Sequence, residues 1–208
     1  MDKQTPNLAL ARPFENSTQE SMLSLCEREL ESSKRDIPSL IKVEFSWRSD
    51  AKNSALVDAL FKKFNLKKIR WHNEARKALR KLKIDKNNAK FSHNVYVVLL
   101  EDQKGIGLYV GETKYTPEER FNTHKAGGFT SSKKVEKKGK EILYSLFAHL
   151  NPIKDREAAE NLEAEMVMAL KNIEKRGLKS NNVFGSTKQK IKETSVLINK
   201  KSGKLKKL

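Results

Sequence analysis

The sequence predicts an α+β protein in which a mainly helical N-terminal extension precedes a small sheet flanked by helices. Two observations support this. Residues 1–92 contain mostly stretches with helical periodicity. From residue 93 onward, short apolar runs and amphipathic stretches follow one another in the order strand, strand, helix, strand, helix. We therefore divide the chain into an extension (1–92), a central domain (93–186) and a basic tail (187–208).

The extension is expected to hold three helices and one strand. Ser17-Thr-Gln-Glu20 has the pattern of a capping box and opens the first helix. The alternating run Leu40–Trp47 is typical of a short strand. Two helical stretches then follow, at about Ser54–Phe64 and Ile69–Leu82, and the second is strongly basic on one side.

The central domain begins with a predicted β-hairpin. Val95–Leu100 is a continuous apolar run typical of a buried strand, Asp102–Gly105 supplies a turn, and Leu108–Gly111 forms the second strand. Thr116-Pro-Glu-Glu119 then opens a helix, because Pro favours the first helical position and Glu119 completes a capping box. That helix is expected to end at Gly127-Gly128.

The second half of the domain is expected to add one strand and one long helix. Ile142–Leu150 is the third strand candidate, and Asp155 opens a helix that reaches about Arg176. Val196–Ile198 is a candidate for a short last strand. The tail Lys200–Leu208 is expected to be mobile.

Charge is concentrated on both sides of a nearly neutral middle. The chain has 43 Lys and Arg against 26 Asp and Glu, a formal charge of +17. Residues 62–90 contribute +10 and residues 186–208 contribute +7. Clustered cations favour a nucleic-acid partner through counterion release, although an anionic membrane or a lysine-rich soluble surface would also explain them.

Cysteine content and hydropathy indicate the compartment. Cys26 is the single cysteine, which excludes an internal disulfide and any multi-cysteine zinc site. The N-terminus has no apolar signal core, and no stretch approaches the ~18 apolar residues that span a bilayer. We therefore expect a cytoplasmic protein, of a prokaryotic cell or a phage, without a membrane partner.

Glu163 lies in the middle of an apolar stripe on the long helix. The stripe consists of Ala159, Leu162, Met166, Val167 and Leu170. Burying an unpaired carboxylate costs several kcal/mol, so Glu163 is expected to meet a cation, a metal ion or a proton. A marginal Glu that reaches water or pairs with an Arg is the ordinary structural alternative.

Two further residue pairs stand out. Arg120 and His124 are spaced i, i+4 and share one helix face, and Arg suits a phosphate because its planar fork donates two parallel hydrogen bonds. Tyr96 and Tyr109 lie in the two strands of the hairpin. Each pair alone is more often a solvated helix face or ordinary core packing.

Taken together, these residues resemble the GIY-YIG nuclease superfamily over about 90 residues. The matching segments are NVY at 94–96, LYVGET at 108–113, the Arg120–His124 pair, LEAEMV around Glu163, and SNNVFG at 180–185. The resemblance implies a central three-stranded antiparallel sheet with helices at its sides. It also implies a metal-dependent endonuclease that hydrolyses phosphodiester bonds in double-stranded DNA.

The resemblance also implies residue roles. Glu163 would bind one Mg²⁺ (or Mn²⁺) ion per active site, and Arg120 would hold the scissile phosphate. Either Tyr96 or Tyr109 would act as general base towards the attacking water, with the other orienting it. His124 would hydrogen-bond to a tyrosine or to the phosphate.

An asparagine after the long helix completes the expected site, and Asn182 is preferred over its neighbour Asn181. The layout, with about ninety residues before the domain and a short tail after it, looks most like the stand-alone type II restriction endonucleases, which suggests a homodimer on a palindromic DNA site. A DNA-repair or mobile-element nuclease, a non-catalytic nucleic-acid-binding protein, and a basic ribosome-associated protein are the alternatives.

Overall fold

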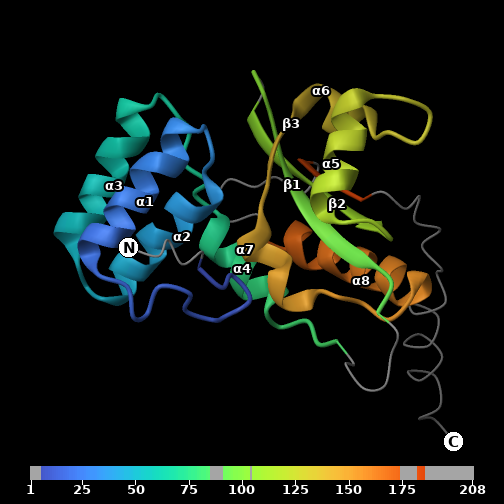
Figure 1. The fold of residues 1–208 in the computed structure, drawn as a ribbon, viewed down its shortest axis with the longest axis horizontal. Coiled ribbons are helices and arrows are strands. Elements are labelled where there is room, and N and C mark those ends of the chain that lie inside the picture. The colour runs from blue at the N-terminus through green and yellow to red at the C-terminus, as the bar shows by residue number, and fades with distance from the viewer. Residues whose placement is uncertain (1–5, 85–90, 104, 174–181, 186–208) are drawn as a thin grey trace, which may run out of the picture.

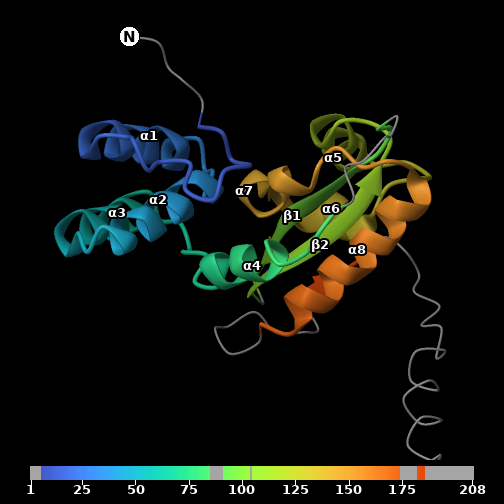
Figure 2. The same cartoon turned by 90° about the horizontal axis from the view of Figure 1, so that it is seen from below.

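The computed structural model describes residues 6–84, 91–103, 105–173 and 182–185, and these form an α+β structure. Its elements are, in order, α1 (Gln19–Glu31), α2 (Asp36–Trp47), α3 (Ala51–Lys63), α4 (His72–Leu79), β1 (Asn94–Asp102), β2 (Gly105–Thr113), α5 (Pro117–Ala126), α6 (Lys133–Lys138), β3 (Gly139–Ile142), α7 (Tyr144–Phe147), the 3-10 turn η1 (Ala148–Leu150), α8 (Arg156–Lys171) and β4 (Val183–Phe184). The helices α1–α3 lie to one side of the sheet (Figures 1 and 2). The expected strand at 196–198 and the tail lie outside the described residues.

The helices α1, α2 and α3 enclose a hydrophobic core of their own, which includes Met22, Phe45 and Phe61. The N-cap of α1 is Thr18 rather than Ser17, since the Thr18 side chain accepts the backbone N–H of Ser21. The Asp50 side chain caps α3 in the same way.

The expected strand at Leu40–Trp47 is wrong, because this segment is most of α2. The same apolar residues also fit helical spacing. In the helix, Leu40, Ile41 and Phe45 form a stripe that is buried against α1 and α3. Trp47, which the strand prediction placed on the apolar face, is 41% exposed. Pro38 lies in the first turn of the helix, where its missing N–H has no intrahelical partner.

The sheet has four strands in the order β3-β1-β2-β4 and is mixed. β1 pairs antiparallel with both β2 and β3, whereas the two-residue β4 pairs parallel with β2 at Leu108 and Tyr109. The sequence predicts three antiparallel strands, so β4 is an addition at the β2 edge.

The third strand is β3, at Gly139–Ile142, and the expected strand at Ile142–Leu150 is wrong. Most of that segment forms α7 and η1. Its buried residues Leu143, Leu146, Phe147 and Leu150 follow the i, i+3, i+4, i+7 spacing of a helix. Strand and helix were hard to distinguish here because the run is short and apolar on nearly every side.

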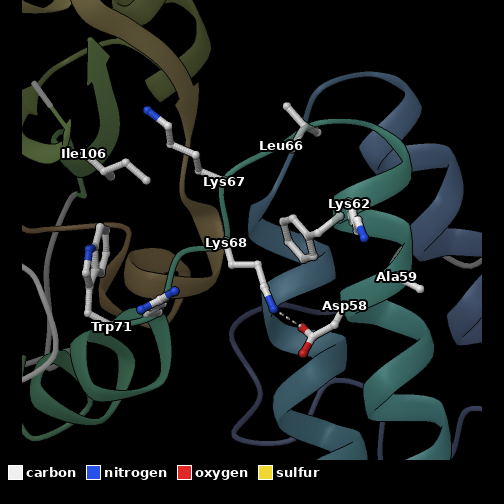
Figure 3. A pocket seen from close by; sticks show the side chains of 10 residues that line it. Asp58, Ala59, Lys62, Leu66, Lys67, Lys68, Trp71 and Ile106 are labelled. Atoms are coloured by element: carbon white, nitrogen blue, oxygen red, sulfur yellow. Dashed lines mark ion pairs between the residues drawn. The ribbon is translucent and has the colours of Figure 1, made fainter. Parts of the chain in front are cut away.

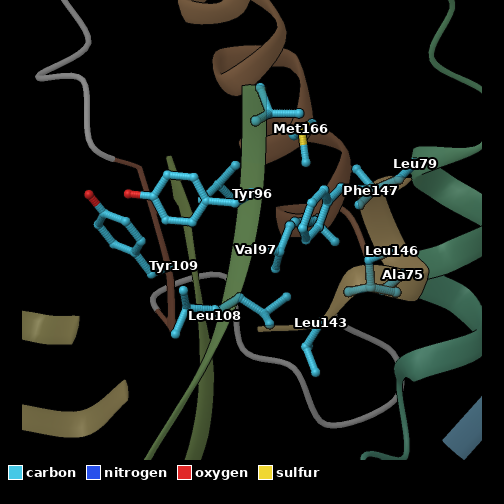
Figure 4. Close-up of a cluster of buried hydrophobic side chains, with 14 of the residues drawn as sticks. Ala75, Leu79, Tyr96, Val97, Leu108, Tyr109, Leu143, Leu146, Phe147 and Met166 are labelled. Atoms are coloured by element: carbon cyan, nitrogen blue, oxygen red, sulfur yellow. The ribbon is translucent and has the colours of Figure 1, made fainter. Parts of the chain in front are cut away.

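The main core lies between the sheet and the helices α4, α7 and α8. Val97 of β1 points towards Leu146 and Phe147, whereas Tyr96 and Tyr109 point away from them on the other side of the strand (Figure 4). α8 begins after the N-cap Asp155 as expected but ends at Lys171, before the expected Arg176, which lies outside the described residues. Among the described residues no helix is long and apolar enough to cross a membrane.

A buried ionic network joins α2 to the sheet. Arg35 is 2% exposed, and its side chain bonds to Glu141 of β3 (Nε–Oε1 3.1 Å) and to Glu101 of β1 (Nη1–Oε2 2.8 Å). The second oxygen of Glu141 accepts the backbone N–H groups of Arg35 and Asp36 at 2.8 and 3.2 Å. The N-terminal helices are therefore fixed to the sheet by a buried Arg35–Glu141 pair and a partly exposed Glu101.

Asp36, His72 and Ser145 form a second buried group at this junction. They have the residue types of a hydrolytic triad, but their geometry does not match one. Asp36 Oδ1 and Ser145 Oγ both lie 2.9 Å from the same ring nitrogen, Nε2 of His72, and Ser145 is fully buried. A triad needs its carboxylate and its nucleophile at opposite ring nitrogens, so we interpret this group as structural.

Candidate active site

Tyr96 and Tyr109 lie on one face of the hairpin. In the antiparallel register Tyr96 is opposite Gly111 and Tyr109 is opposite Val98, so the two phenols are diagonal neighbours. Their ring centroids are 6.1 Å apart. Both side chains are buried.

The Tyr96 ring occupies the space that a side chain at position 111 would fill. A Cβ atom at Gly111 would lie 2.5 Å from Tyr96 Oη and 2.6 Å from Cζ, closer than real Cβ contacts. The glycine of the second motif therefore makes room for the phenol of the first motif.

Gly111→Ala should push the Tyr96 phenol away from its position and destabilise the fold by about 1–3 kcal/mol, the usual result of overpacking. The measurement is urea unfolding of the single and double variants. In a Tyr96→Leu background the same Gly111→Ala change should have little effect, since the clash is removed. An equal loss in both backgrounds would show that the ring does not depend on this glycine.

The helix α5 carries Arg120 and His124 to the phenols. Its start is set by the predicted capping box, in which the Thr116 side chain accepts the Glu119 N–H and the Glu119 carboxylate accepts the Thr116 N–H. Its end is at Gly127, which has a φ of +79°. With both ends in place, His124 Nε2 lies 2.8 Å from Tyr96 Oη.

A backbone donor sets the direction of the hydrogen bonds around His124. The Ser132 N–H donates to His124 Nδ1 at 2.9 Å, so in the neutral ring the proton is on Nε2. Nε2–H then donates to the Tyr96 oxygen. Tyr96 and Tyr109 also share a hydrogen bond, and since the Tyr96 oxygen already accepts from His124, its own proton points to Tyr109.

Burial raises the pKa of both phenols. For Tyr96 the next contribution is the neighbouring Tyr109, which raises the pKa further, and Arg120 opposes both. For Tyr109 the hydrogen bond from Tyr96, the Ser132 side chain and Arg120 all lower the pKa without overcoming burial. The direction of the shared bond makes Tyr109 the phenol that loses a proton more readily.

Burial, with a smaller contribution from Arg120, lowers the pKa of His124 to about 4 from the ordinary value of 6.5. Between these two pH values the unfolded chain binds the proton and the folded chain does not. The free energy of unfolding should therefore fall as the pH is lowered from 6.5 to 4, by at most about 3 kcal/mol from this residue. Urea unfolding across this range should show a shallower slope for His124→Gln than for the native chain.

His93→Gln is the matched control, because His93 belongs to the same domain as His124 but is partly exposed. It should keep the native pH dependence. An unchanged slope in His124→Gln would place the acid sensitivity elsewhere.

Glu163 is buried in α8, with 1% of its surface exposed, as its place in the apolar stripe predicts. Burial is the largest cause of the raised pKa values of Tyr109 and Glu112, and the charge of Glu163 adds to it in both. Gly185, just after β4, lies directly against it: a Cβ there would be 2.9 Å from Glu163 Oε1. Gly185 and Ser132 are site residues that sequence reasoning missed, since neither a lone Gly nor a backbone N–H has a distinctive signal.

The remaining two predicted site residues differ in their placement. The guanidinium of Arg120 hydrogen-bonds to Tyr96, which places it beside the phenols. It also donates to the Thr130 carbonyl at 3.0 Å. The Asn182 amide instead donates to the Ile106 carbonyl at 3.3 Å and holds β4 on the β2 edge. Asn182 is therefore not brought into the tyrosine cluster, and Asn181 lies outside the described residues.

Glu163 is the one residue predicted to bind a metal ion, and its donor atoms are carboxylate oxygens, which hard cations such as Mg²⁺ prefer. Among the described residues, no three His, Cys, Asp or Glu side chains form a group that could hold a metal ion. Mg²⁺ commonly keeps several waters and takes only one or two carboxylates from the protein. Glu163 by itself would supply one such carboxylate.

A separate basic groove lies between α3 and the hairpin end of the sheet (Figure 3). Its cavity of about 810 Å³ is lined by Lys62, Lys67, Lys68, Arg70 and the wall residue Trp71, among others. Lys67 and Lys68 have acidic partners, Glu101 at 3.7 Å and Asp58 at 3.0 Å. This groove contains part of the positive charge that the sequence places in residues 62–90.

Other cations of that stretch have a structural role. Arg76 and Arg80 of the α4 region donate to the backbone carbonyls of Ala9, Leu10 and Ala11. Burial lowers the pKa of Arg76 to about 10. Part of the positive charge of residues 62–90 is therefore used within the fold, and only the remainder can contact a polyanion.

Comparisons of this chain with models of protein families, with curated proteins and with solved structures find no match.

Proposed function

We propose that this protein is a GIY-YIG-type, Mg²⁺-dependent endonuclease that hydrolyses phosphodiester bonds in double-stranded DNA. The observation that carries the proposal is the convergence of Tyr96, Tyr109, Arg120 and His124 through hydrogen bonds, with the Glu163 carboxylate close enough to act on Tyr109. The antiparallel run β3-β1-β2, with α5 and α8 beside it, supports the assignment to this fold.

In the proposed reaction Arg120 binds the scissile phosphate, for which its planar fork is suited. Tyr109 accepts the proton of the attacking water as a phenolate, and the hydrogen bond from Tyr96 stabilises that phenolate. His124 orients the Tyr96 phenol through its hydrogen bond to the Tyr96 oxygen. The products carry a 5′-phosphate and a 3′-hydroxyl.

Glu163 is the residue that would hold Mg²⁺. A bound divalent cation neutralises charge on the phosphate and lowers the pKa of a nearby phenol, which offsets the effect of burial on Tyr109. Tyr109 would need this ion to act as a base, because Arg120 alone does not offset the rise in pKa that burial causes.

Access to this site involves β4. Tyr109 and Glu163 are both buried. Val183 and Phe184 pair with Leu108 and Tyr109, and Gly185 lies against Glu163. So short a strand adds little pairing energy, and we propose that it moves aside when DNA binds.

The test is a supercoiled plasmid incubated with the purified protein in Mg²⁺ or in EDTA. The proposal requires cutting that depends on Mg²⁺ and is lost in Tyr109→Phe. Salt-sensitive binding without any cutting would support the rival function, a non-catalytic nucleic-acid-binding protein that uses the groove at Lys62–Arg70.

The biological role is proposed as type II-like restriction, in a cytoplasmic homodimer with one active site for each strand. Gel filtration with and without cognate DNA should then give a dimer, and digestion should linearise the plasmid at a palindromic sequence. A strict monomer that only nicks would favour repair or mobile-element biology.

A further inference from the structure

The loop between α5 and α6 presents a phenylalanine to solvent beside the candidate active site. Phe129 has a relative exposure of 106%, far above the other large apolar side chains of the described chain. It follows Gly127 and Gly128, whose φ angles are +79° and +118°. The loop projects beyond the sheet in Figure 1.

This exposure does not come from a loose loop. The segment after Phe129 is tied to α5 by three hydrogen bonds: Arg120 Nη2 to the Thr130 carbonyl (3.0 Å), Ser131 Oγ to the Thr123 carbonyl (3.0 Å) and Ser132 N–H to His124 Nδ1 (2.9 Å). Two of these partners, Arg120 and His124, belong to the proposed active site. The position of Phe129 is therefore coupled to the position of the phosphate-binding residue.

The helix that follows Phe129 is rich in lysine. α6 begins four residues later and carries Lys133, Lys134, Lys137 and Lys138. Lys133 and Lys138 have ion-pair partners, whereas Lys134 and Lys137 have no carboxylate partner in the part of the chain that the structure describes. The Lys134 ammonium lies 4.0 Å from the centre of the Phe184 ring. An exposed ring followed by a lysine-rich helix matches a ligand with flat apolar faces and a row of phosphates.

We propose that Phe129 inserts into bound duplex DNA and stacks on a base next to the scissile phosphate. The inference rests on the proposed function for its ligand. Apolar side chains that enter a base step partly unstack it, and stacking on an aromatic side chain tolerates any base sequence. The lysines of α6 would meet the flanking phosphates, while Arg120, tied to the same loop, meets the phosphate that is cut.

The first test is the affinity for a fluorescent duplex, measured by anisotropy in EDTA so that no cutting occurs. Phe129→Ala should weaken binding about 5- to 100-fold, the range for loss of one stacked base. The slope of log affinity against log salt should stay the same, because a phenyl ring displaces no counterion. Phe91→Ala is the matched control, since Phe91 is also an exposed phenylalanine (42%) but lies outside this loop, and it should bind like the native chain.

The second test measures tryptophan fluorescence in Phe129→Trp. The native chain, measured in parallel, gives the emission of Trp47 and Trp71, which is subtracted. Stacking should quench the added emission when duplex DNA is titrated in. Native affinity in Phe129→Ala together with no quenching in Phe129→Trp would overturn the inference, as would quenching by anionic lipid vesicles but not by DNA. Quenching without Mg²⁺-dependent cutting would leave the stacking role standing while the nuclease proposal fails.

Discussion

Glu163→Gln should reduce Mg²⁺-dependent DNA cutting by about 10³-fold or more, while the protein remains folded. The two side chains have nearly the same shape, so the substitution at this buried position of α8 removes charge without making a cavity. Loss of the ion removes several kcal/mol of transition-state stabilisation, and each 1.36 kcal/mol corresponds to about tenfold in rate. The measurement is the initial rate of plasmid cutting across a Mg²⁺ titration.

Glu165→Gln is the matched control. Glu165 lies on the same helix two residues later, but its side chain is exposed. This variant should cut at the native rate. Robust cutting by Glu163→Gln at all Mg²⁺ concentrations would remove Glu163 from the proposed metal site.

Arg35→Met should destabilise the fold by about 3–5 kcal/mol, because it leaves the buried Glu141 carboxylate without its charged partner. Burial is already the largest influence on Glu141 and raises the pKa of that carboxyl despite Arg35. The measurement is the free energy of unfolding in urea at neutral pH.

Arg35→Met combined with Glu141→Gln should recover most of this loss, since a neutral amide oxygen can still accept the backbone N–H groups of Arg35 and Asp36. Arg156→Met, which breaks an exposed i, i+4 pair with Glu160, is the control and should change stability by less than about 1 kcal/mol. If the double variant were as unstable as Arg35→Met alone, the loss would come from packing of the arginine stem.

Elements whose signals are local were predicted well from sequence. The hairpin with its turn, the capping box of α5, the helix end at Gly127 and the N-cap Asp155 all agree with the structure. The caps and helix ends depend on residues within four positions of one another, and the hairpin depends on two adjacent runs and the turn between them, so the chemistry of the local sequence is sufficient.

The two wrong strands failed for one shared reason. Both 40–47 and 142–150 are short apolar stretches in which alternate residues and helical positions overlap, and only their neighbours decide between the two. α2 has helices on its sides, and α7 packs against β1 and α4.

The sequence by itself determined the α+β class, the face shared by Arg120 and His124, and the place of Glu163 within an apolar stripe, because 3.6-residue and two-residue periodicities assign each side chain to a face. The tertiary structure alone decided which faces meet. It brought His124 to Tyr96 across 28 residues, the Asn182–Gly185 segment to the β2 edge and to Glu163, and Glu141 to Arg35 across 106 residues. Contacts at such separations depend on how whole elements pack, and periodicity within one element carries no information about its partner.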